Sequence, residues 1–135
     1  MSRYCLDTSA YSHFQRGDAR VTELIDRAEW IGMPAIALGE LRVGFRLGER
    51  RDDNEDLLRE FLSNPVVEEL SVDAEVSRHY ADIVTDLRRS GTPIPTNDVW
   101  IAATAARSGA IVLSYDDHFD CIARVGSLVL PEAES

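Results

Sequence analysis

Tyr4-Cys5-Leu6-Asp7-Thr8-Ser9 begins as an apolar run and ends in residues that commonly start helices. Residues 4–6 have the character of a short buried strand, and Asp7 stands at the point where a helix would begin. The stretch therefore predicts a strand that passes directly into a helix, with a carboxylate at the junction. Such a unit is the starting point of an α/β fold.

The rest of the chain continues this alternation. Further apolar runs predict strands at 30–33, 66–70, 111–114 and 127–130. Helical spacing and breaker residues predict helices at 9–16, 19–28, 34–47, 73–89 and 97–107, with Pro34 as a first helical residue and Thr96 as a cap. A charged stretch from residue 49 predicts one more helix, with a buried stripe of Leu57, Leu58, Phe61 and Leu62.

Continuously apolar strands joined by short helical connections are typical of a parallel sheet. We therefore expect an α/β fold, with a parallel sheet of about four to five strands flanked by helices on both faces. A chain of 135 residues fits one domain, so residues 1–135 are expected to form a single unit.

The composition restricts the location of the protein. No apolar run approaches the ~18 residues that a membrane span needs, and Asp7 comes too early for the apolar core of a signal peptide. Cys5 and Cys121 are too few for a disulfide framework or a zinc site. We therefore expect a cytoplasmic protein with no membrane partner.

The charge balance opposes a broad nucleic-acid-binding face. The chain has 14 basic residues, all arginine, and 24 acidic residues, which give a net charge of −10. An acidic protein repels phosphate backbones at long range. Any contact with RNA must therefore be local and depend on a metal ion and a few arginines.

Three acidic residues fall where the sites of parallel α/β sheets lie, beyond the carboxyl ends of the strands. Asp7 follows the first strand, Asp116 follows the strand at 111–114, and Asp98 stands in the first turn of the helix at 97. Taken singly, Asp7 and Asp98 are also explained as helix caps. The pattern leaves both interpretations open.

Glu40 is a different case because its neighbours are apolar or small. A carboxylate on such a helix needs a partner, since burying a lone charge costs several kcal/mol. Gly39 and Gly44 weaken the same helix, which predicts close packing or ligand access there.

Several carboxylates in one pocket repel one another unless a hard cation neutralises them, and Mg²⁺ prefers oxygen ligands. Such an ion can activate a water molecule for attack on a phosphodiester. The sequence contains no glycine-rich phosphate loop and no recognisable serine–base–acid pattern. Of the histidines, His13 and His79 are expected to be surface or packing residues, whereas His118 lies beside Asp116.

Four segments together resemble the PIN-domain family. These are YCLDTS at 4–9, ALGELRVG at 37–44, PTNDVWIAA at 95–103 and LSYDDHF at 113–119, and they occur in the family's order. The third is the most specific, and in the fourth Ser114 stands where threonine is usual. The compact length and the third segment look most like VapC-type toxins of toxin–antitoxin pairs.

The resemblance implies a site and a function. It implies that Asp7, Glu40, Asp98 and Asp116 are catalytic residues that hold Mg²⁺, with Mn²⁺ able to substitute. The supporting residues would be Thr8, Ser9, Asn97, Ser114 and Asp117. Asp116 is preferred to Asp117 as the fourth acid because it keeps the motif's spacing to Ser114 and Phe119. The activity implied is cleavage of structured RNA (tRNA or rRNA) by a homodimer that a VapB-like antitoxin inhibits.

Other classes of protein fit less well. A phosphoryl-accepting receiver domain relies on a lysine, and this chain contains none. A haloacid-dehalogenase-type phosphatase requires an aspartate two residues after its nucleophile, where this chain has Ser9. The remaining alternative is a catalytically silent PIN fold that only binds RNA or protein.

Overall fold

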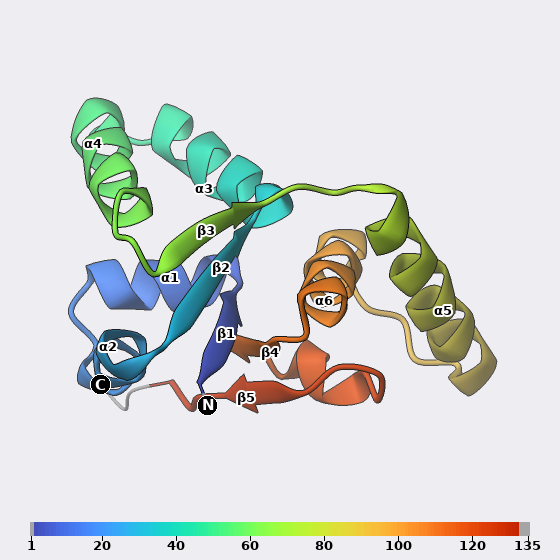
Figure 1. The fold of residues 1–135 in the computed structure, drawn as a ribbon. Helices are drawn as coiled ribbons and strands as arrows, with labels where there is room; N and C mark the ends of the chain where they lie inside the picture. The colour runs from blue at the N-terminus through green and yellow to red at the C-terminus, as the bar shows by residue number, and fades with distance from the viewer. Residues whose placement is uncertain (1, 133–135) are drawn as a thin grey trace.

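Five parallel strands form one sheet in the computed structural model, which describes residues 2–132 (Figure 1). The order across the sheet is β3-β2-β1-β4-β5. The strands are β1 (Arg3–Leu6), β2 (Trp30–Pro34), β3 (Val67–Leu70), β4 (Ile111–Ser114) and β5 (Ser127–Val129). Every neighbouring pair runs parallel. The predicted parallel α/β fold is therefore confirmed.

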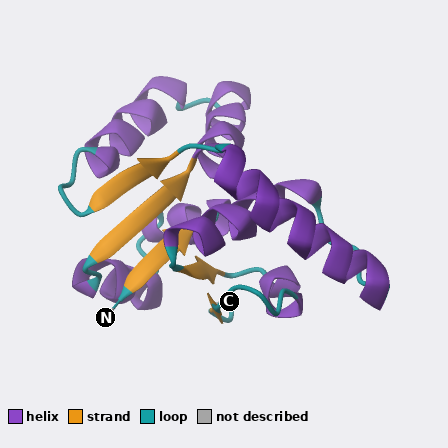
Figure 2. Cartoon of the chain, turned by 45° about the vertical axis from the view of Figure 1, so that its right-hand side comes forward, coloured by secondary structure: helices purple, strands orange, loops and turns teal. Residues whose placement is uncertain are grey.

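Helices cover both faces of this sheet (Figure 2). They are α1 (Thr8–Gln15), α2 (Ala19–Arg27), α3 (Ala35–Leu47), α4 (Arg51–Leu62), α5 (Ala74–Ser90) and α6 (Thr96–Ser108), with a short 3₁₀ helix, η1 (Asp117–Cys121). One core packs α5, α6 and η1 against the sheet. The other packs α1, α2 and α4 against the opposite face, and α3 contributes to both.

The alternation of side chains along each strand explains the two cores. Cys5 lies in the core beneath α5 and α6, whereas Leu6 lies in the core beneath α1 and α2. Both are fully buried, which is why the strand reads as a continuous apolar run. Leu6 pairs with Leu113 of β4, so the chain leaves the two strands at the same edge of the sheet.

The strand order changes direction between β1 and β4. From β1 the chain adds β2 and then β3 on one side, and it then crosses back through α5 and α6 to place β4 on the other side of β1. Ligand sites in open α/β sheets lie beyond the carboxyl ends of the strands at such a reversal. Asp7 and Asp116 follow the two strands that flank it.

A few local predictions are wrong. Thr96 does not cap α6; it is the first helical residue, and the cap position belongs to Pro95, which offers no side-chain acceptor. Leu57 is 43% exposed and does not join the buried stripe of α4, whereas Leu58 and Phe61 are buried. Pro34 ends β2 and precedes α3 rather than beginning it. Over residues 2–132, no helix combines the length and apolar character that crossing a membrane requires.

Candidate active site

Asp7 is a buried carboxylate that is held from several directions. It caps α1, because its Oδ1 accepts a hydrogen bond from the amide of Ala10 at 2.9 Å. The Ser9 hydroxyl donates to the same oxygen at 2.8 Å, and the Ser114 hydroxyl donates to Oδ2 at 2.6 Å. The capping interpretation of Asp7 is thus correct, but the bond from β4 goes beyond what a cap needs.

The environment of Asp7 disfavours its charged form. Burial raises the pKa of the Asp7 carboxyl above its ordinary value, and the negative charge of Asp98 adds to the rise. The hydrogen bonds from its neighbours oppose this rise without cancelling it. A carboxylate in this position is charged at lower cost when a cation lies nearby.

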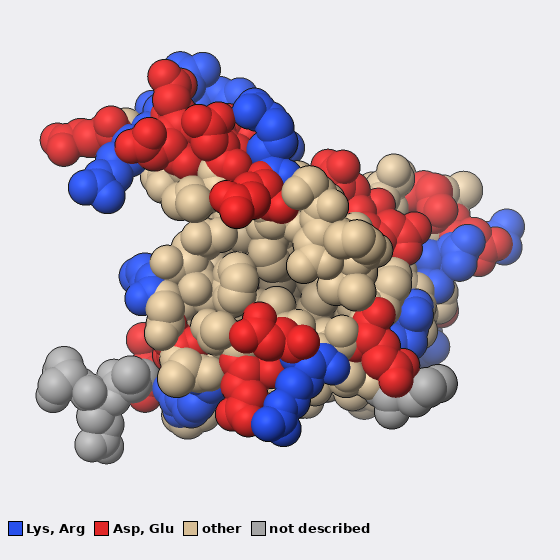
Figure 3. Space-filling view, turned by 60° about the vertical axis from the view of Figure 1, so that its left-hand side comes forward, with Lys and Arg blue, Asp and Glu red and all other residues tan. Residues whose placement is uncertain are grey.

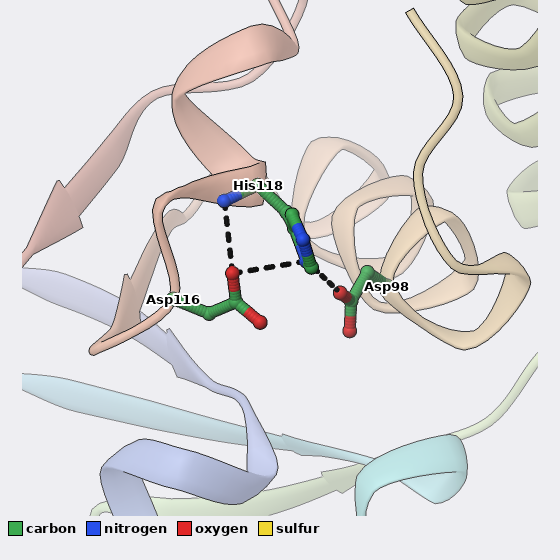
Figure 4. A group of neighbouring side chains, drawn as sticks. All are labelled: Asp98, Asp116 and His118. Atoms are coloured by element: carbon green, nitrogen blue, oxygen red, sulfur yellow. Dashed lines mark hydrogen bonds and ion pairs between the residues drawn. The ribbon is translucent and has the colours of Figure 1, made fainter.

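Asp98, Asp116 and His118 form a compact group (Figure 4). Each offers one potential ligand atom, and these atoms lie within 4.8 Å of one another. The imidazole stands between the two carboxylates, with Nδ1 at 3.1 Å from an Asp98 oxygen and 2.9 Å from an Asp116 oxygen.

Two helix starts bring this group together. Asp98 is the third residue of α6, and α6 has no side-chain cap, so the interpretation of Asp98 as a cap is wrong. Asp116 precedes η1 and accepts a hydrogen bond from the amide of His118 at 2.9 Å. The tight turn after β4 thereby places both Asp116 and His118 opposite the start of α6.

Charge crowding changes the pKa values in the group. Burial raises the pKa of Asp98, and the charges of Asp116 and Glu40 raise it further, while the bond from His118 opposes the rise. The same hydrogen bond raises the pKa of His118, and the charge of Asp116 contributes to that increase. Protonated His118 is therefore a partial counter-ion for the two acids.

Glu40 has the partners that its apolar helix required. The Thr8 hydroxyl donates to one carboxylate oxygen at 2.7 Å, and the Asn97 amide donates to the other at 3.3 Å. These bonds join α3 to the starts of α1 and α6. Close packing is not the reason for the glycines, because a methyl group at Gly39 or Gly44 would meet no atom within 4 Å.

The structure thus brings some predicted residues into one group and places others around it. Asp98 and Asp116 share the compact group, whereas Asp7 and Glu40 lie outside it. The charge of Glu40 raises the pKa of Asp98, and the charge of Asp98 raises the pKa of Asp7. Hydrogen bonds to these acids come from Thr8, Ser9, Asn97 and Ser114. Asp117 is exposed and lies outside the compact group.

His118 joins the group without having been selected from the sequence as a site residue. Its position two residues after Asp116, in a turn that follows a strand, is the signal that points to it. A group of two carboxylates and one imidazole, with Asp7 near Asp98, suits a divalent cation: carboxylates are ligands for Mg²⁺ and Mn²⁺, and the imidazole is a softer nitrogen donor. Burial, together with the neighbouring acids, raises the pKa values of Asp7 and Asp98, and a bound cation would favour their charged forms.

Charges of both signs are mixed on one face of the molecule (Figure 3). On the face drawn in Figure 3, arginines and acidic residues are mixed over the projecting α3–α4 pair, and uncharged residues form the hollow beneath it. Acidic side chains also border the lower part of this face. No continuous basic patch crosses this view of the described residues.

Comparison with known proteins identifies the family of the chain. Residues 4–125 match the PIN domain, which is nearly the whole chain. The chain therefore belongs to the PIN-domain family.

Within that family, named relatives extend the comparison. Ribonuclease VapC5 from Mycobacterium tuberculosis is 34% identical over 115 residues, which cover 84% of this chain and 83% of the relative. Ribonuclease VapC4 from the same organism is 34% identical over 91 residues, 67% of this chain and 69% of the relative. The chain also resembles the solved structure of VapBC-5 from M. tuberculosis, a member of the VapBC family of toxin–antitoxin systems. The two align with a TM-score of 0.77 at 27% identity, and the alignment covers 96% of this chain and 100% of the other.

Proposed function

We propose that this protein is the toxin of a toxin–antitoxin pair and acts as a metal-dependent endoribonuclease on structured RNA, either tRNA or rRNA. The observation that carries the proposal is the group of Asp98, Asp116 and His118, with Asp7 beside it, at the strand reversal. The VapC ribonucleases among the relatives support the activity and the toxin role. A catalytically silent PIN fold would have no need to crowd carboxylates at a cost to their charged forms.

The chain's own residues provide the ligands and hold them in place. Asp98, Asp116 and Asp7 would hold Mg²⁺, or Mn²⁺ in its place, and Glu40 would face the same space from α3. Ser9 and Ser114 fix the orientation of the Asp7 carboxylate, while Thr8 and Asn97 fix that of Glu40. When bound, the ion would neutralise the phosphodiester and lower the pKa of the attacking water.

The proposal includes a VapB-like antitoxin and a homodimer. Exposed apolar side chains on the α3–α4 pair support a partner chain: Val43 is 59% exposed and Leu47 is 84% exposed. Apolar side chains that gather on a surface are typical of sites covered by another chain. The VapBC complex among the structural relatives supports an antitoxin in that role.

The test is cleavage of total RNA by the purified protein, with and without Mg²⁺ or Mn²⁺, followed by sequencing of the new 5′ ends. We expect cleavage at defined sites that requires the metal and stops with EDTA. Expression without antitoxin should arrest growth, and Asp7→Asn should relieve the arrest. The control for loss of a capping carboxylate is Asp73→Asn, because exposed Asp73 caps α5 through a 2.9 Å bond from a backbone amide and lies outside the acidic group. Cleavage that persists in EDTA would contradict the mechanism.

A further inference from the structure

His13 and Tyr115 form a stacked pair of rings next to the acidic group. The ring centroids are 3.7 Å apart and the planes differ by 12°. His13 belongs to α1, whereas Tyr115 is the residue between Ser114 and Asp116 at the end of β4. The stack therefore joins the segment that carries Asp7 to the segment that carries Asp116.

His13 is also bonded to the hydrogen-bond network of Asp7. Its Nδ1 lies 2.9 Å from the carbonyl oxygen of Ser9 and 3.3 Å from Nη2 of Arg16, and it donates to Ser9 in the tautomer that carries the proton on Nδ1. The hydroxyl of the same serine donates to Asp7 and accepts a hydrogen bond from the amide of Tyr115 at 2.9 Å. Ser9 is thus held by His13 through its main chain and bonded to Tyr115 through its side chain.

The position of Asp116 depends on the same contacts. Its amide donates to the Ser114 hydroxyl at 2.8 Å, and that hydroxyl donates in turn to Asp7. A displacement of Tyr115 would move the residues on both sides of it, Ser114 and Asp116. The ring stack therefore packs against the segment that carries Ser114 and Asp116.

The ring of Tyr115, not its hydroxyl, makes these contacts. The residue is 8% exposed, and its hydroxyl faces the Asp18 carboxylate rather than Ser9, Ser114 or Asp116. Burial and the nearby Asp18 carboxylate raise the pKa of Tyr115 to about 12, so the phenol is neutral at neutral pH. The phenol oxygen thus has no evident part in the network.

We propose that His13 and Tyr115 are positioning residues that set how well Asp7 and Asp116 share a divalent cation. The inference rests on the proposed function, since it requires that these acids bind a metal. Residues that orient metal ligands typically change metal affinity or activity by about 10- to 100-fold when they are replaced.

The experiment is a calorimetric titration of the metal-free protein with Mn²⁺, combined with kcat and KM for RNA cleavage. We expect His13→Ala to raise the Kd for Mn²⁺ about tenfold and to lower kcat with little change in KM for RNA. His13→Phe keeps a ring in the stack and should recover most of the affinity, and Tyr115→Phe should keep the Kd of the parent. His79→Ala, a replacement of a helical histidine on α5, is the matched control and should bind Mn²⁺ as the parent does.

His13→Leu is measured alongside His13→Ala, because it keeps the buried volume if the alanine variant fails to fold. Circular dichroism at the temperature of the titration confirms that each variant is folded. The inference alone would be overturned if the parent binds Mn²⁺ and the folded His13→Ala or His13→Leu variants bind it equally well. A parent that does not bind Mn²⁺ would overturn the proposed function as well.

Discussion

Replacing Asp98 by asparagine should stabilise the metal-free protein and remove its stabilisation by metal. The pKa of Asp98 is raised, so its folded state favours the protonated carboxyl. Such a group contributes stability below its unfolded pKa, near 3.9, and loses that contribution as the pH rises through the raised folded value. At neutral pH the charged Asp98 therefore costs stability, and a neutral asparagine does not have this cost.

The magnitude follows from the geometry of the group. The potential ligand atoms of Asp98 and Asp116 lie within 4.8 Å of each other. Two like charges at that distance repel by ~3.5 kcal/mol at an effective dielectric constant of about 20. The hydrogen bond from His118 and the partial exposure of Asp116 reduce this repulsion. We expect a net gain of about 1 kcal/mol, which for a domain of this size raises the Tm by about 4 °C. The parent should gain ~2.7 kcal/mol when Mg²⁺ is at 100 times its Kd, and Asp98→Asn should gain little.

Asp53 provides the matched control because it is the third residue of α4, as Asp98 is the third residue of α6, and it is exposed. Asp53→Asn loses only a favourable interaction with the helix dipole, which is typically ~0.3–1 kcal/mol. Its metal-free Tm should therefore fall slightly, and its response to Mg²⁺ should match that of the parent. Melting curves for all three proteins, with and without Mg²⁺, check this. If Asp98→Asn melts like Asp53→Asn and keeps the full Mg²⁺ response, Asp98 is not a ligand.

Three further predictions concern the neighbours of Asp98. Asp116→Asn should weaken Mn²⁺ binding and slow cleavage by about tenfold or more. Asp117→Asn should change the Kd for Mn²⁺ by less than about twofold, because the Asp117 side chain is exposed. Equal losses of Mn²⁺ affinity in the two variants would contradict the choice of Asp116. Ser114→Ala should lower the free energy of unfolding, measured in urea, by about 1–3 kcal/mol, because buried Asp7 loses a hydrogen-bond donor. Ser114→Thr keeps the hydroxyl and should lower the free energy of unfolding by less. The pKa of His118 is raised in the folded protein, so its protonated form stabilises the metal-free parent relative to His118→Gln. This difference in the free energy of unfolding should be complete below about pH 6.5 and disappear as the pH rises through the pKa of His118 in the folded protein. A difference that does not depend on pH would rule out the ion pairs of His118.

Most of the fold could be predicted because the strands of a parallel sheet are buried on both faces. Val112 and Leu113 face different cores, so β4 reads as an uninterrupted apolar run with clear ends. The errors lie where tertiary contacts decide the outcome. Leu57 and Leu58 look alike in the sequence, but only one of them faces the sheet. No periodicity predicts η1, whose five residues are held by the cap from Asp116.

The site could be predicted in part for a related reason. Asp7 and Asp116 follow neighbouring strands, and the parallel sheet brings both to one edge whatever the side chains do. The sequence places His118 two residues after Asp116, but the folded turn decides whether its imidazole reaches Asp98. The stack of His13 on Tyr115 also joins segments more than 100 residues apart, and only the assembled structure brings them together.

The net charge of −10 fits the proposed function, in which contact with RNA would depend on a bound metal ion. Phosphate is repelled by the acids at the strand reversal, and a bound divalent cation would change the sign of the potential at that point alone. Association with RNA through few arginines releases few counter-ions, so it gains little affinity at low salt. A partner segment with positive charge, by contrast, would meet complementary charge over much of the surface. For the proposed toxin, the acidic composition that disfavours RNA as a general ligand would favour a positively charged antitoxin segment as the tighter partner.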